Sequence, residues 1–191
     1  MDVITCIKER RTHKDFHKGE DLSRDHLIEL VQIAMTAPNH YRNSPWRFVI
    51  CEGHKLKSLW DKLSQVFDQV FADRTVEWRE EKKKGLSSRF LRQSAFIYIT
   101  SLDNDNPKIK QENYAACSCA IQNLSLALVN QNMVSYWSTS SLFSSPECQQ
   151  LFQRPLKEEF FVGAIWIGHP KERIIRKDID FKEKYSFWEG H

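Results

Sequence analysis

The stretch Gln111–Gln131, QENYAACSCAIQNLSLALVNQ, carries the clearest structural signal in this chain of 191 residues. Its apolar residues Ile121, Leu124 and Leu128 recur at helical spacing, which predicts one long helix. Alanine, serine and cysteine fill positions 115–120, so the first half of the helix is small on nearly every side. Small residues let two helix backbones approach closely, as at a subunit interface, and a buried core helix explains them equally well.

The rest of the chain predicts further helices and a few short strands. Helices are expected over 2–11, 23–37 and 56–70 and from about 146, and strands over 46–50, 96–100, 134–137 and 160–167. The first helix is expected to turn Val3, Ile4 and Ile7 inward. Gly85 is expected to break a charged segment, and Gly168 to end the last strand. Few strands, several helices and no regular β–α alternation predict the α+β class.

Length and composition fit one compact domain over residues 1–191. The net charge of +3 is too small to indicate a polyanionic partner. The apolar runs are too short for a membrane span, and the first eleven residues do not resemble a signal peptide. The five cysteines have no disulfide-framework spacing and read as free thiols of a reducing compartment. We therefore expect a cytoplasmic protein with no membrane partner.

Several common functional sites have no counterpart in the sequence. The six glycines are too scattered for a phosphate-binding loop, and no nucleophile elbow occurs. Cys117 and Cys119 diverge on a predicted helix, so we expect no metal site. The run Lys82–Lys84 could contact nucleic acid, but it follows Glu77, Glu80 and Glu81, as in a salt-bridged solvated helix. We therefore expect no nucleic-acid partner.

Two basic clusters remain at the ends of predicted elements. Arg10–Lys14 follows the first helix, and Lys171–Arg173 follows the last strand. Basic residues at a helix end can simply satisfy carbonyl groups and the helix dipole, and the second cluster could be a solvated loop. If the two clusters converge, their side chains form a phosphate clamp that replaces a glycine-rich loop.

The segment Pro38–Trp46 also stands out, with two prolines, two asparagines, a histidine and an arginine between a helix and a strand. Stiff loops rich in donors often recognise a planar polar ligand. The alternative is a turn followed by a core tryptophan, and we expect Trp46 to be such a core residue.

Four blocks, in this order, resemble the nitroreductase family, specifically its small bacterial members. Residues 10–16, RRTHKDF, are similar to the opening R-R-S-x-[RK]-x-F of the family, and residues 37–48, APNHYRNSPWRF, to its A-P…P-W-x-F segment. Residues 137–140, WSTS, and 167–173, IGHPKER, are similar to two later segments. Each block is a weak signal alone, whereas the ordered set is specific and spans nearly the whole chain.

The resemblance implies a central, mainly antiparallel sheet flanked by helices, in an intertwined homodimer with FMN (flavin mononucleotide) at the subunit interface. The phosphate would be bound by Arg10, Thr12, Lys171 and Arg173, with Arg11 along the ribityl chain and Lys14 at the N1/C2=O edge of the ring. The remaining contacts would come from His40 and Asn43 of the partner's loop, or the reverse, and from Trp137, Ser138 and Thr139 flanking the ring. Residues 174–191 would form an arm that packs on the partner.

The resemblance further implies an oxidoreductase that passes electrons from NADH or NADPH through the flavin to a nitroaromatic, a quinone or another small acceptor. A cation at N1 stabilises the negative charge of the reduced flavin, and Lys14 is the candidate. The alternative is a protein that binds and stores flavin without turnover. The chain departs from the family at Asn132–Ser135, where many members have a glycine-rich approach, and at Ser44 and Ser140, which replace glutamine and glycine.

Overall fold

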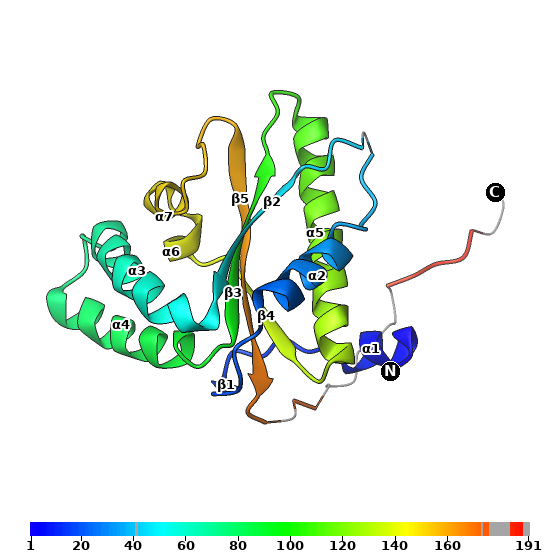
Figure 1. Ribbon diagram of the computed structural model, residues 1–191. Helices are drawn as coiled ribbons and strands as arrows, with labels where there is room; N and C mark the ends of the chain where they lie inside the picture. Colours follow the sequence, from blue (N-terminus) through cyan, green and yellow to red (C-terminus); the bar gives the residue numbers. More distant parts are fainter. Residues whose placement is uncertain (41, 173, 176–183, 189–191) are drawn as a thin grey trace.

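The computed structural model describes residues 1–40, 42–172, 174–175 and 184–188 (Figure 1). Within them, one antiparallel sheet has the strand order β1-β5-β3-β2, and β4 also pairs with β5. The strands are β1 (Phe16–His17), β2 (Trp46–Glu52), β3 (Ala95–Leu102), β4 (Val134–Ser138) and β5 (Glu159–Pro170). The expected α+β class with an antiparallel sheet is confirmed.

Helices cover both faces of this sheet (Figure 1). They are α1 (Val3–Glu9), α2 (Arg24–Ala34), α3 (Leu56–Val70), α4 (Val76–Phe90), α5 (Pro107–Asn130), α6 (Ser141–Ser144) and α7 (Pro146–Leu151), with a 3-10 turn η1 (Gly53–Lys55). One face carries α2 and α5, and the other carries α3, α4, α6 and α7 (Figure 1). Helix starts follow local chemistry, since the Ser23 hydroxyl accepts from the His26 N–H at 3.2 Å.

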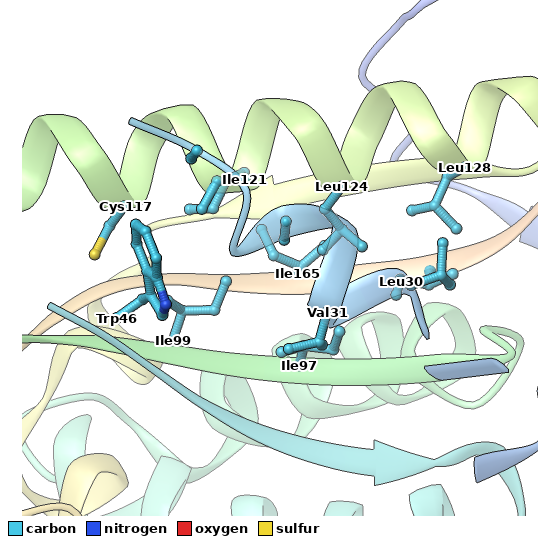
Figure 2. Packing of buried hydrophobic residues seen from close by; sticks show 14 of the residues in the cluster. Leu30, Val31, Trp46, Ile97, Ile99, Cys117, Ile121, Leu124, Leu128 and Ile165 are labelled. Carbon is cyan, nitrogen blue, oxygen red and sulfur yellow. The ribbon is translucent and has the colours of Figure 1, made fainter. Parts of the chain in front are cut away.

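The core between α2, α5 and the sheet is aliphatic. Figure 2 shows side chains of α5, among them Leu124, packing toward those of α2 and of the strands. Ile97 and Ile165 are fully buried there. Trp46 lies in the same core, as expected. Because burying each such side chain contributes roughly 1.5–3 kcal/mol, this layer holds α5 rigidly against the sheet.

The opposite core is largely aromatic. Phe90, Phe96 and Trp166 are fully buried, and the ring centroids of Phe90 and Trp166 lie 5.3 Å apart in an edge-to-face contact. The hydroxyl of buried Tyr98 donates to the carbonyl of Phe143 at 2.9 Å. The sheet is thus fixed from both sides, and its ends can present functional side chains.

Three local expectations were wrong. α4 continues through Gly85, where an added Cβ would meet only open space, because a glycine on the surface of a helix costs only about 1 kcal/mol. β5 continues through Gly168 to Pro170, because β1 pairs with its end. Val3, Ile4 and Ile7 of α1 point outward, with exposed fractions of 63%, 55% and 47%.

Candidate functional site

The first basic cluster lies between α1 and β1 and runs beside β4. Thr12 forms a parallel bridge with Ser135, and the His13 N–H donates to the Ser135 carbonyl at 3.2 Å. The Ser135 hydroxyl in turn donates to the hydroxyl of Ser125 on α5 at 3.1 Å. The Lys14 Nζ lies 5.7 Å from the centroid of the Tyr136 ring. This segment is therefore held in place by β4 and α5.

The second basic cluster reaches the first through Asp15. Lys14 and Lys171 line one cavity of about 270 Å³, together with His13, Asp15, Glu172 and Ile174. The Asp15 carboxylate contacts the Lys171 Nζ at 3.3 Å and the Arg92 Nη1 at 3.0 Å. Lys171 thus lies beside the first cluster, whereas Arg173 lies outside the described residues. We call Arg10, Arg11, Thr12, Lys14 and Lys171 the basic edge.

Two cations of the basic edge have no counter-charge among the described residues. Within the described part of the chain, neither Arg10 nor Lys14 has an ion pair. Arg11 differs, because its Nη1 donates to the carbonyls of Lys8 at 2.5 Å and of Arg10 at 2.7 Å. For Arg11, the simpler explanation is therefore confirmed: its side chain satisfies carbonyl groups at the end of the helix. Its Nε is nonetheless buried, with no partner among the described residues. Such an edge is suited to an anion, which adds charge-assisted hydrogen bonds.

His13 and Asp15 belong to this site, although the sequence did not single them out. Burial lowers the pKa of His13, and the nearby charge of Arg11 lowers it further, which favours the neutral ring. Asp15 offsets part of the positive charge and orients Lys171. Only their position in the sequence could have indicated this, since both residues flank Lys14 of the first basic cluster.

The 38–46 loop lies elsewhere, beside the first half of α5. The His40 Nδ1 is 3.0 Å from a Glu112 carboxylate oxygen, and the Asn43 Nδ2 donates to the Asn113 Oδ1 at 3.0 Å. Arg42 and Ser44 have positive φ angles of 51° and 47°. Two such residues in one loop are strained, which is common where a loop is shaped for binding.

One chain does not bring His40 and Asn43 to the basic edge. The loop contacts α5 at Asn113, and the edge contacts it through Ser125. These two positions are twelve residues apart, about 18 Å along a helix. A single chain therefore keeps the loop and the basic edge at separate places along α5.

The residues at the end of β4 differ in accessibility. The Trp137 Nε1 donates to the Val162 carbonyl at 3.2 Å, and its ring lies over Gly163, where a Cβ would come within 2.0 Å of it. Ser138 is buried, and Thr139 is exposed directly after the strand. Before β4, Asn132 adopts a left-handed φ of 57°, which asparagine tolerates better than most residues.

Comparison with known proteins assigns the family. The model of the Nitroreductase family matches residues 7–169, which include the first basic cluster, the 38–46 loop and β4. This chain belongs to the nitroreductase family. Nitroreductases are oxidoreductases, so membership also assigns the class of the protein.

Similar proteins agree with this assignment along the whole chain. A Bacillus subtilis protein named "Putative NAD(P)H nitroreductase YfhC" is 25% identical over 94% of this chain and 91% of its own length. The crystal structure of a nitroreductase-like family protein from Bacillus cereus has a TM-score of 0.86 at 27% identity and covers 100% of this chain and 97% of that one. A Bacteroides fragilis nitroreductase with bound FMN has a TM-score of 0.72 at 16% identity, covering 99% and 100%. The nitroreductase-like fold is thus confirmed.

Other features of the described residues bear on partners and metals. No helix among them is long and apolar enough to cross a membrane, and they contain no group of three or more potential metal ligands. The Lys83 Nζ pairs with Asp68 at 2.9 Å and with Glu80 at 2.6 Å, which confirms the salt-bridged helix expected there.

Proposed function

We propose that this nitroreductase is an FMN-dependent enzyme that takes electrons from NADH or NADPH and delivers them to a small acceptor such as a nitroaromatic or a quinone. The observation that carries the proposal is the basic edge, where Lys171 and Lys14, which has no ion pair among the described residues, line one cavity. The B. subtilis relative is named for NAD(P)H, and the B. fragilis neighbour contains FMN, which supports both cofactors.

The basic edge would hold the phosphate end of FMN. Arg10 has no competing partner in the described part of the chain, and the exposed Thr12 and Lys171 can contribute a hydroxyl and an ammonium donor. Arg173 would complete the set, and Arg11 would lie along the ribityl chain. An anion here would replace repulsion between the cations with charge-assisted hydrogen bonds.

Lys14 would lie at the N1/C2=O edge of the ring. Bound FMN supplies the hydride and electron chemistry. The ammonium of Lys14 would stabilise negative charge at that edge, and Trp137, Ser138 and Thr139 would flank the ring. His13, held neutral by burial, would leave Lys14 as the cation nearest to the ring.

A homodimer would bring His40 and Asn43 to the basic edge of the partner. The separation of about 18 Å along α5 favours a second copy as the source of the loop, and the chain exposes apolar side chains that such a copy could cover. They are Val3, Ile4 and Ile7 of α1, Ile28, Ile33 and Met35 of α2, and Tyr114 of α5. The small residues 115–120 would let two α5 helices approach closely.

Residues 174–191 would form an arm on the partner as part of a single domain spanning 1–191. In the described part of this segment, Tyr185, Phe187 and Trp188 are 70%, 79% and 90% exposed. Large aromatic side chains rarely remain so exposed without a partner surface. We also place the protein in the cytoplasm, in keeping with its five free cysteines.

The absorption spectrum of the purified protein tests this function. We expect a yellow dimer with one FMN per chain that bleaches when NADH or NADPH is added without oxygen and recovers with a quinone. Bound flavin that never bleaches with either donor would favour the storage alternative. A colourless protein that does not bind added FMN would refute the proposal.

A further inference from the structure

A second cavity, of about 320 Å³, shares no lining residue with the basic edge. It lies among the segment that follows β1, the turn η1 with the start of α3, and the residues before β3. It is lined by Lys18, Gly19, Asp21, Gly53, His54, Leu56, Lys57, Leu91 and Gln93. Leu56 and Gln93 are only 2% and 4% exposed and form the inner wall, whereas the charged residues are exposed and form the rim.

The inner wall contains an unsatisfied amide. Both the Nε2 and the Oε1 of Gln93 are buried with no hydrogen-bond partner among the described residues, and the same holds for the hydroxyl of Ser94. The backbone here is fixed, because the Ser94 N–H donates to the Ile167 carbonyl at 2.7 Å. Burying an amide with neither hydrogen bond made is costly, so a native protein usually supplies a partner. Gln93 therefore carries an unpaired donor and acceptor in the wall of this cavity.

The rim offers groups of both charges. Lys18 has no ion pair in the described part of the chain, whereas Lys57 pairs with Asp61 at 2.5 Å and His54 lies 3.8 Å from Glu52. Asp21 likewise has no ion pair there, and its carboxylate packs on Gly53, where a Cβ would lie 2.0 Å from the Oδ1. Only glycine permits this approach. The cavity thus combines a two-sided amide, an apolar wall, one carboxylate and a basic rim.

We propose that this cavity binds an adenine nucleotide. A glutamine amide can donate to N7 and accept from the N6 amino group of adenine, whereas the same edge of guanine offers two acceptors, N7 and O6. Leu56 and Leu91 would pack against the base. Asp21 would accept hydrogen bonds from the ribose hydroxyls, as carboxylates do in dinucleotide sites, and Lys18 would pair with the phosphate. The inference goes beyond the proposed function, because no residue of the basic edge takes part.

Calorimetry on the FMN-loaded protein, with AMP as the probe, tests this site. We expect one AMP per chain and at least tenfold weaker binding of GMP. Gln93→Leu and Lys18→Glu should each weaken AMP binding at least tenfold while the FMN content stays unchanged. Lys84→Glu, the same charge change at an exposed position of α4, should leave AMP binding unaltered.

Two further variants separate this site from alternatives. Arg10→Ala should leave AMP binding intact, whereas its loss would mean that AMP occupies the basic edge and would overturn the assignment. Without AMP, Gln93→Leu should raise Tm, because it removes an unpaired amide. A lower Tm would show that the amide is already satisfied and would contradict the proposal, as would equal binding of AMP and GMP or no binding of AMP. If Gln93→Leu fails to fold, Lys18→Glu on the exposed rim still decides the outcome.

Discussion

Charged side chains at the two ends of β5 differ in whether they have partners within the chain. At its start, Glu159 is 4% exposed and fully engaged, because Arg154 and the hydroxyl of Thr100 donate to its carboxylate. Beyond its end, Lys171 joins Lys14 at one cavity, and Lys14 has no ion pair in the described part of the chain. A charge satisfied within the chain serves the fold, whereas unpaired cations that converge indicate a ligand.

Removing the partner of Glu159 should damage the fold and spare the site. Arg154→Ala leaves a buried carboxylate unpaired and should lower the free energy of unfolding by about 3–5 kcal/mol. Urea denaturation measures this, with the exposed Lys157→Ala as the control. FMN bound per folded chain should not change. A loss of less than about 1 kcal/mol would show that the pair is not structural.

Removing a cation from the basic edge should weaken FMN binding and leave the fold intact. Arg10→Ala should weaken FMN binding by about 1.5–3 kcal/mol, roughly ten- to 150-fold, because the phosphate loses a charge-assisted hydrogen bond. Fluorescence titration of the apoprotein measures the affinity. Lys8→Ala, an exposed position of α1, should have little effect on it. Equal affinity in Arg10→Ala and wild type would remove Arg10 from the phosphate site.

Lys14 should influence the flavin potential more than flavin binding. Lys14→Ala should lower the two-electron midpoint potential by on the order of 30 mV, which corresponds to about 1.4 kcal/mol. Lys14→Arg keeps the charge and should retain most of the wild-type potential. A redox titration in which Lys14→Ala shows no downward shift would place another group at the ring edge.

The smallest effect should come from His13. Its folded pKa lies below the usual 6.5, so the unfolded chain binds the proton more readily between these two values. Stability should therefore fall as pH drops below about 6.5 and be fully present above it. His13→Gln should reduce this slope in unfolding curves measured across pH 7 to 5. An unchanged slope would mean that His13 is not the titrating group.

Sequence patterns predicted the elements whose residues contact their neighbours at regular spacing. Leu124 and its helical repeat located α5, and Ser23 located the start of α2. The end of β5 could not be predicted, because it depends on pairing with β1, about 150 residues away along the chain. The outward side of α1 was also missed, since periodicity shows which residues share a face of a helix and not what covers that face.

The site was partly predictable for a similar reason. Ordered motifs pointed to Lys14 and Lys171, and the fold brings both to one cavity. The role of Ser135 could not be predicted, because it rests on a backbone bridge to Thr12 and on a hydroxyl contact with Ser125 that appear only in the fold. The positions of His40 and Asn43 relative to the edge could not follow from one sequence, because a single chain holds them far from it.

A mixed dimer tests the central claim, that each flavin site combines the basic edge of one chain with the loop of the other. Arg10→Ala and Asn43→Ala should each weaken FMN binding in the respective homodimer. In a heterodimer of the two variants, one site carries both changes and the other carries neither. One tight site should therefore return, and titration would report one tightly bound FMN per dimer. If both residues act within the same chain, each site of the heterodimer carries one of the two substitutions. No tight FMN binding would then return, and this result would contradict a site shared between two chains.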